Sequence, residues 1–231
     1  MKIVTNQKLI TRNRRIGQFT VYASLIVLIG GFIASLQPNP DMLSLAFGAM
    51  ILGLILSQVG TYYSNRFVRS PRPDEAIVEN LKTLEDKYTL YIYSTPVPFL
   101  LVSPQGIWVL TTSMVDGKVV YEKNRWRHKG GNWFLKLFSE GLGRPDIEIA
   151  SQLDDIKKKF TKELPDITLP EIQAALVILN PKTEIENVAD APYPTIPCKK
   201  IKETIKKNIK TAGVAPAVVE AVNNLLMPKA E

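Results

Sequence analysis

Two long uncharged segments dominate the first third of the chain. Between Arg15 and Arg66 the only charged residue is Asp41. A membrane-spanning helix needs about 20 apolar residues to cross about 30 Å of hydrocarbon. Phe19–Leu36 is just long enough, Met42–Tyr63 is comfortably long, and the short segment between them contains two prolines and an asparagine, which is typical of a tight turn. The pattern predicts a transmembrane helical hairpin.

Cations flank this hairpin at one end only. Residues 1–15 contain five Lys or Arg and no acid, three arginines follow the second segment within 64–72, and the turn has no cation. The positive-inside rule then places both termini in the cytoplasm. We expect a two-span protein of the cell membrane, with a basic cytoplasmic arm at 1–15, the hairpin at 16–63 and a basic linker at 64–72. A cleaved signal peptide is the rival interpretation, which we disfavour because a second apolar segment follows directly.

Small residues lie one helical turn apart in both predicted spans. The pairs and triplet are Gly30/Ala34, Gly31/Ser35 and Ala49/Gly53/Ser57. Such spacing lets two helices approach closely, either in a homodimer or within the hairpin itself. We favour packing within the hairpin because its two helices are already tethered. No ionisable side chain lies inside either span, so we interpret the hairpin as an anchor and not as a transport path.

Residues 73–231 have the mixed pattern of a soluble α/β domain. Pro73 opens a predicted helix whose apolar residues recur on one face, at Ile77, Leu81 and Leu84. Short runs rich in aromatic and branched residues then predict strands. The predicted strands are 90–93, 99–102, 107–112, 118–121 and 174–179, with a turn at 103–106 and a hairpin turn at 116–117; later helices begin at Pro145 or span 199–211 and 216–226. We therefore predict an α/β fold, a mixed sheet flanked by helices.

The net charge of +7 comes mostly from the N-terminal segment. From Ser64 onward the chain has 24 Lys and Arg against 21 Asp and Glu, so the charge is weak evidence for nucleic-acid binding. A single cysteine, Cys198, excludes an intramolecular disulfide. A single histidine, His128, excludes a site that needs two histidines.

One cationic cluster surrounds a tryptophan. Lys123, Arg125 and Arg127 lie next to Trp126 in a segment that reads as an exposed loop. Basic residues interleaved with an aromatic ring are typical of a phosphate contact with a base stacked on the ring. We favour a structural role for the tryptophan, capping the sheet.

A second cationic cluster follows the predicted strand at 174–179. It begins at Lys199 and includes Lys206, and its isoleucines at 201, 205 and 209 form a narrow apolar stripe. The stripe is compatible with contact to anionic lipid. We favour an amphipathic helix that packs on the sheet and keeps its lysines in solvent.

Several landmarks between about 70 and 160 resemble the nuclease-related domain family, NERD. They are, in order, Asp74-Glu75, Val102-Ser-Pro-Gln-Gly106-Ile-Trp-Val-Leu, Asp116-Gly117-Lys-Val-Val, Trp126, Pro145 and Gln152. The resemblance implies a fold similar to that of restriction endonucleases. It also implies a metal site in which an aspartate and a Glu-x-Lys pair hold Mg²⁺ and orient water, because phosphodiester cleavage uses hard oxygen ligands and a nearby cation.

The chain departs from that family pattern at the metal site. The aspartate position holds Pro98, the glutamate position Thr111 and the lysine position Ser113, and of the family's acids only Glu75, on the first helix, is in place. A first-turn glutamate commonly does no more than complement the helix dipole. We therefore expect no metal cofactor and no catalysis, and a binding or scaffold role toward nucleic acid or protein at the membrane. The alternative is a Mg²⁺-dependent nuclease in which Asp116 or Glu122 reaches a rearranged site.

Overall fold

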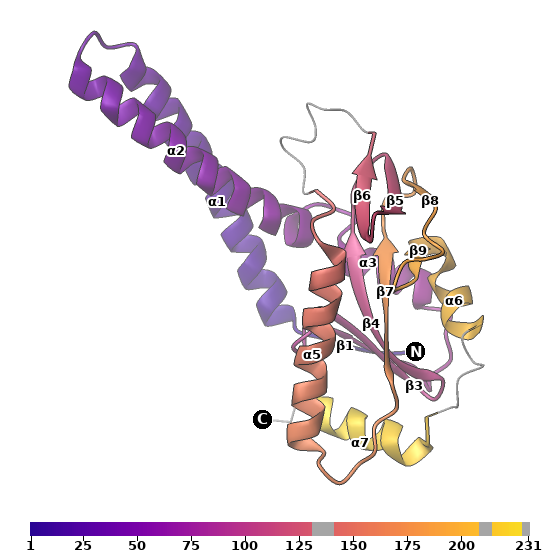
Figure 1. Cartoon of the computed structure of the whole chain (residues 1–231). Helices are drawn as coiled ribbons and strands as arrows, with labels where there is room; N and C mark the ends of the chain where they lie inside the picture. The colour runs from indigo at the N-terminus through magenta and orange to yellow at the C-terminus, as the bar shows by residue number, and fades with distance from the viewer. Residues whose placement is uncertain (131–140, 208–213, 228–231) are drawn as a thin grey trace. The chain divides into compact units, whose positions relative to one another are not determined.

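The computed structural model describes residues 1–130, 141–207 and 214–227, and the chain divides into two units (Figure 1). One unit, the hairpin unit, runs from Gln7 to Arg72. The other, the sheet domain, combines Met1–Asn6 with the described residues from Pro73 onward.

The hairpin unit contains the two expected long helices. Helix α1 spans Gln7–Ser35 and α2 spans Pro40–Tyr63, followed by a π-helical turn, η1, at Ser64–Val68. Asn39 caps α2 by accepting a hydrogen bond from the backbone N–H of Asp41, and Pro40 suits the first helical position. Only 17% of the apolar window in α1 and 11% of that in α2 is buried, whereas a core helix of a soluble protein is mostly buried. Both helices are therefore long and apolar enough to cross a membrane.

Small residues at seven-residue intervals hold the two helices together. Gly17, Ser24 and Gly31 are buried on α1, and Ala46, Gly53 and Gly60 are buried on α2. A Cβ atom added at Gly31 would lie 2.8 Å from the Cβ of Ala49, and one added at Gly53 would lie 2.5 Å from Leu28. These residues pack the hairpin itself. Of the small residues singled out from the sequence only Gly31, Ala34 and Gly53 are buried, whereas Gly30 and Ser35 are exposed, so a homodimer would need another face, such as that of Gly30.

The sheet domain is built on a six-stranded mixed sheet in the order β1-β2-β3-β4-β7-β9. Strands β2, β3 and β4 form an antiparallel meander, whereas β1, β7 and β9 pair in parallel with β2, β4 and β7. The strands are β1 (Lys2–Thr5), β2 (Thr89–Ile92), β3 (Phe99–Ser103), β4 (Gly106–Ser113), β7 (Ile172–Ile178) and β9 (Thr195–Pro197). At the predicted turn between β3 and β4, the Ser103 hydroxyl accepts from the N–H of Gln105 and donates to the carbonyl of Gly106, whose φ of +154° favours glycine.

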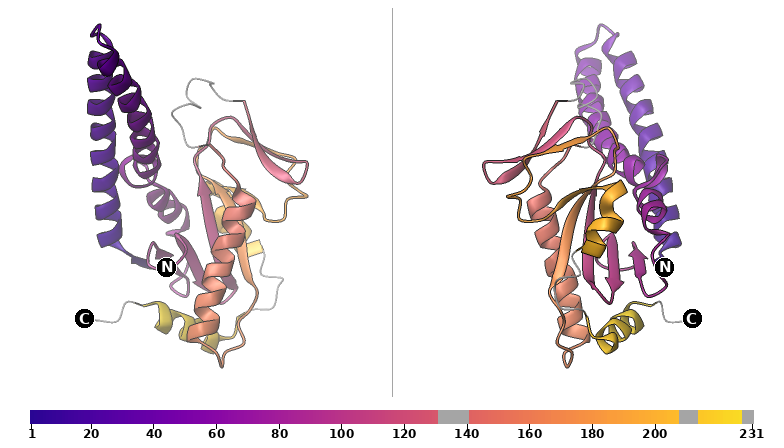
Figure 2. Two further views of the ribbon diagram at one scale, coloured as in Figure 1. Left: turned by 60° about the vertical axis from the view of Figure 1, so that its left-hand side comes forward. Right: turned by 90° about the vertical axis from the view of Figure 1, so that its right-hand side faces the viewer.

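Helices cover both faces of this sheet, so side chains alternate between two cores (Figure 2). Leu100 and Val109 face α5 (Pro145–Glu163) and α7 (Pro216–Leu226). Leu101 and Trp108 face α3 (Pro73–Leu81) and α6 (Ile201–Lys207), which follows a short 3₁₀ turn, η2, at Cys198–Lys200. The mixed sheet flanked by helices is confirmed, as are the buried strand near 174–179 and the helices that begin at Pro73, Pro145 and Pro216. The expected extension of α6 to Thr211 lies partly outside the described residues.

The expected arm at 1–15 is wrong as a single element. Its first residues form β1, with Lys2 paired to Thr89 and Thr5 to Ile92, and its remaining residues begin α1 at Gln7. The hairpin unit is therefore inserted in the sequence between two neighbouring parallel strands of one sheet, β1 and β2.

The expected hairpin at Asp116-Gly117 is also wrong. Strand β5 (Lys118–Glu122) does not return along β4 but starts a second sheet, in the order β6-β5-β8, with β6 at Arg125–Lys129 and β8 at Glu184–Glu186. The turn into β6 lies at Lys123 and Asn124, whose φ values of 51° and 62° are those of a tight two-residue hairpin. The segment expected as a loop is thus a strand.

Candidate functional site

The positions expected for the family's metal site lie around the second half of β4. Thr111 is buried and paired with Leu176 of β7, and Ser113 is half-buried two residues further along the same strand. Pro98 precedes β3 and uses its carbonyl to accept a hydrogen bond from the Tyr93 N–H. Because side chains alternate along a strand, Thr111 and Ser113 point to the same face of the sheet, the one that α5 covers.

A hydrogen-bonded chain occupies this position. The Thr111 hydroxyl donates to Gln152 Oε1 on α5 at 2.7 Å, and Gln152 Nε2 donates to Glu148 Oε1 at 3.2 Å. Thr111 and Gln152 are both buried, whereas Glu148 is exposed. The threonine hydroxyl and the amide oxygen satisfy each other, which stabilises the contact between sheet and helix. Neutral oxygens that already share a hydrogen bond are poor ligands for Mg²⁺.

The structure does not bring Glu75 to these residues. Helix α3 packs its Ile77 and Leu81 against the opposite face of the sheet from that covered by α5. Glu75 itself is exposed in the first turn of α3, and the neighbouring Asp74 is the buried acid, with 6% of its surface exposed. The family landmark points to Glu75, whereas its neighbour Asp74 is the inward-facing residue of the turn.

The two acids considered for a rearranged site lie next to or in the second sheet. Glu122 is at the end of β5, where an ion pair with Lys129 lowers the pKa of its carboxyl group. Asp116 is exposed, and its backbone carbonyl contacts the imidazole Nε2 of His128. Over residues 1–130, 141–207 and 214–227, no group of three or more His, Cys, Asp or Glu side chains is placed to hold a metal ion.

Trp126 is part of the core of the sheet domain. Only 4% of its surface is exposed, its indole Nε1 donates to Thr195 Oγ1 at 2.9 Å, and its ring lies parallel to that of Tyr193 with centroids 6.4 Å apart. Tyr121 contacts the same ring edge-on at 5.1 Å. The indole therefore joins the second sheet to β9 and has no free face for a nucleic-acid base.

The cations around Trp126 share their surface with acids. Lys123, Arg125 and Arg127 are exposed, and Arg125 pairs with Glu122 in the register of β5 and β6. On the same outer face Lys118 forms ion pairs of 2.8 Å with both Glu184 and Glu186 of β8, which raise the pKa of its amine. Alternating charges of this kind leave little net positive potential for a phosphate backbone.

The lysines of the second cluster lie on the solvent side of α6. Lys199 and Lys206 are exposed, while Ile201 and Ile205 are buried against α3 and the sheet. The apolar stripe is thus used inside the domain, as favoured from the sequence, and within the described part of α6 it is not available to lipid. Ile209 lies outside the described residues.

Comparison of the chain with models of protein families, with curated protein sequences and with solved structures finds no match.

Proposed function

We propose that this protein is a membrane-anchored, catalytically inactive relative of the nuclease-related domain family, whose sheet domain serves as a binding or scaffold module for a protein or nucleic acid at the cytoplasmic face. The proposal combines two supports. The hairpin unit has the length and outward apolar surface of an anchor, and the sheet domain has a threonine–glutamine hydrogen bond at the position expected for metal-binding carboxylates.

The anchored topology is inferred chiefly from the pairing of β1 with β2. These strands lie on either side of the hairpin in the sequence, and they are paired in one sheet from Lys2 to Thr5. A sheet cannot form across a bilayer, so a chain that folds this way must cross the membrane an even number of times between β1 and β2. Cleavage as a signal peptide would remove β1 from the sheet, which argues against that interpretation. The cations at the open end of the hairpin then favour the cytoplasmic side for the sheet domain.

Impermeant thiol labelling in intact cells tests this topology. Gln37 is exposed in the turn between α1 and α2, and Lys182 is exposed in the sheet domain, so cysteines at these positions report the two sides. Cys198 needs no removal, because it is buried and burial raises the pKa of its thiol to about 11. We expect Gln37→Cys to label in intact cells and Lys182→Cys only after permeabilisation. The reverse result would reverse the orientation, and labelling of neither or both before permeabilisation would contradict a two-span anchor.

A metal-dependent nuclease is the second candidate, and one observation favours it. Glu148 joins the Thr111–Gln152 chain and so places a carboxylate at the end of that chain. The test is incubation of the purified full chain with Mg²⁺ or Mn²⁺ and single- or double-stranded DNA, beside the variants Glu148→Gln and Glu75→Ala. We expect any cleavage to be the same in the wild type and in both variants. Metal-dependent cleavage that disappears in Glu148→Gln would establish the nuclease, because contaminating enzymes ignore the substitution.

A further inference from the structure

The hairpin unit has a strongly asymmetric charge. Between Gln7 and Arg72 the chain has seven cations and one acid, and the acid, Asp41, lies in the first turn of α2 at the closed end of the hairpin. All seven cations lie at the open end, on the start of α1 or in and after η1. We call them the basic collar: Lys8, Arg12, Arg14, Arg15, Arg66, Arg69 and Arg72.

The collar extends the membrane helix without a break. Helix α1 starts at Gln7, well before the apolar span at Phe19, so it presents more than two turns of basic helix at the membrane surface. At about 1.5 Å per residue, Arg15 and Arg12 lie about 6 Å and about 10 Å before Phe19 along the axis. The headgroup layer on each side of a bilayer is about 5–8 Å thick. A hairpin that spans the membrane therefore holds Arg15 at the level of the lipid phosphates and Arg12 just outside it.

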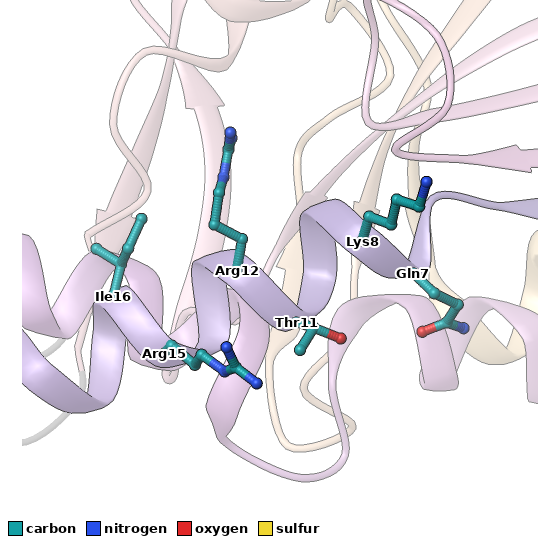
Figure 3. Close-up of a pocket in the computed structure, with 6 residues that line it drawn as sticks. All are labelled: Gln7, Lys8, Thr11, Arg12, Arg15 and Ile16. Atoms are coloured by element: carbon teal, nitrogen blue, oxygen red, sulfur yellow. The ribbon is translucent and has the colours of Figure 1, made fainter.

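Three of these cations share the outward face of α1. Ile10 and Gly17 are buried on one side of α1, where a Cβ atom added at Gly17 would contact Tyr63 and Ser64. Lys8, Arg12 and Arg15 lie on the opposite side, where they line a shallow hollow together with Gln7, Thr11 and Ile16. Figure 3 shows Lys8 and Arg12 extending upward from the helix, and Arg15 and Thr11 lying next to each other at its lower edge. The hollow thus combines three cations and two polar side chains with one apolar side chain, Ile16, at its membrane end.

The four collar cations on α1 have no carboxylate partner among the described residues, whereas seven cations of the sheet domain do. Within the described residues, no ion pair involves Lys8, Arg12, Arg14 or Arg15, and each of these side chains is exposed. In the sheet domain, acids pair with Lys82, Lys87, Lys118, Lys129, Arg144, Lys158 and Lys159. Unpaired arginines are available for a charge-assisted contact with an external anion.

We propose that Arg12 and Arg15 bind the phosphate of an anionic phospholipid headgroup, with Lys8 farther from the bilayer adding to the attraction of the anionic surface, so that the basic collar selects anionic lipid around the anchor. The inference rests on the proposed membrane anchoring and adds a ligand to it. Lipid is favoured over nucleic acid because the hollow adjoins the apolar span through Ile16, which suits an acyl chain next to a phosphate. The ring of Tyr62, stacked under the Arg66 guanidinium at 4.0 Å, also belongs at an interface between hydrocarbon and headgroups.

The test measures lipid retained by the full chain in detergent after purification from membranes of phosphatidylcholine and phosphatidylglycerol, using native mass spectrometry. The wild type is expected to retain phosphatidylglycerol in preference to phosphatidylcholine. Each cation near the surface contributes about fivefold to binding of anionic lipid, so Arg12→Gln/Arg15→Gln should weaken the preference about 30-fold. Arg125→Gln/Arg127→Gln removes the same charge from exposed positions of β6 and should leave the preference unchanged.

Competition separates the sources of the anion. Short-chain phosphatidylglycerol should displace the retained lipid, whereas inorganic phosphate or a single-stranded oligonucleotide at the same concentration should not. Displacement by the oligonucleotide or by phosphate alone, equal retention of both lipids, or equal loss in the β6 variant would overturn the proposal. Extraction of membranes at alkaline pH distinguishes failure of the headgroup site from failure of the membrane anchor. A collar variant that stays in the membrane yet keeps its lipid preference contradicts only the headgroup site, and a wild type absent from the membrane contradicts the anchor.

Discussion

At the scale of single residues, Thr111 shows best what occupies the position expected for a metal ligand. Its hydroxyl is used inside the domain, between a strand and a helix, and both partners of the hydrogen bond are buried. A buried donor or acceptor that loses its partner costs about 1–3 kcal/mol, which is more than the bond itself contributes. The residue therefore has a structural role whose strength can be measured.

Thr111→Val keeps the shape of the side chain and removes its hydroxyl, which leaves the buried Gln152 Oε1 without its partner. We expect the free energy of unfolding to fall by about 1–3 kcal/mol. Thermal unfolding of the detergent-solubilised chain measures the change. Thr111→Ser retains the hydroxyl, so its free energy of unfolding should fall clearly less. An equal fall in both variants would assign the cost to packing and not to the hydrogen bond.

Cys198 supplies a pH-dependent prediction at the same scale. Its thiol contacts the Ala76 carbonyl and the Asn80 side-chain amide, and burial raises its pKa to about 11. An unfolded thiol ionises near pH 9, so between about pH 9 and about pH 11 the unfolded state loses a proton that the folded state keeps. The thiol therefore lowers stability as pH rises through that window and has no such effect below it.

The measurement compares wild type with Cys198→Ala from pH 7 to pH 11. We expect the difference in unfolding midpoint between the two proteins to be constant up to about pH 9 and then to shift against the wild type. At pH 8 the wild-type thiol should also react with maleimide far more slowly than Lys182→Cys. Rapid labelling of native Cys198 would contradict its burial.

At the scale of elements, the hairpin depends on small residues spaced by seven. This interval keeps one narrow face of each helix toward the other, so the backbones approach closely enough that side chains interlock around them. Gly30 and Gly31 are neighbours in the chain but differ completely in surroundings. An added Cβ at Gly30 meets no atom within 4 Å, whereas one at Gly31 meets the Ala49 Cβ at 2.8 Å and the Ala46 carbonyl at 3.3 Å.

Gly31→Ala should therefore force α1 and α2 apart and destabilise the hairpin by about 1–3 kcal/mol, the usual cost of overpacking. Gly30→Ala places the same methyl group in open space and should leave stability unchanged or slightly raised. Thermal unfolding in detergent compares the two variants. A larger loss in Gly30→Ala would indicate that its outward face packs against a second copy of the chain.

At the scale of the whole molecule, the order of elements matters more than any one of them. The sheet domain includes a strand from each side of the hairpin unit, so the hairpin unit and the sheet domain are linked twice along the chain. Removal of the first 72 residues would delete the hairpin unit and also expose the edge of β2, whose four residues are all buried. An exposed apolar strand edge promotes aggregation.

We predict that the sheet domain becomes a stable soluble protein only if β1 is kept. A chain in which about 12 Gly and Ser residues replace 7–72 can bridge about 19 Å, a span suited to a parallel crossover. We expect it to be monodisperse in size-exclusion chromatography and resistant to proteolysis. The chain that starts at Pro73 should aggregate or be digested under the same conditions; equal behaviour of the two would mean that β1 contributes little.

The sequence alone determined the local features whose physical causes are local. Uninterrupted apolar segments predicted two helices long and apolar enough to cross a membrane, because crossing hydrocarbon requires about 20 such residues in a row. Prolines with following acids marked the starts of α3 and α5, and short runs rich in aromatic and branched residues marked β2, β3 and β4. The replacement of the expected aspartate, glutamate and lysine by Pro98, Thr111 and Ser113 is equally a property of the sequence.

Only the tertiary structure decided what depends on partners distant in the chain. Lys2–Thr5 is too short and too polar to stand out as a strand, and it becomes one because its hydrogen-bonding partner, β2, lies more than 80 residues later. Strand β5 was assigned to the wrong neighbour because a turn signal gives no information about which strand follows it in space. Likewise, a basic segment that reads as a loop is the strand β6, since it pairs with β5 and places Trp126 in the core between the exposed Arg125 and Arg127. Burial and pairing result from the whole sheet, and therefore no single stretch of sequence specifies them.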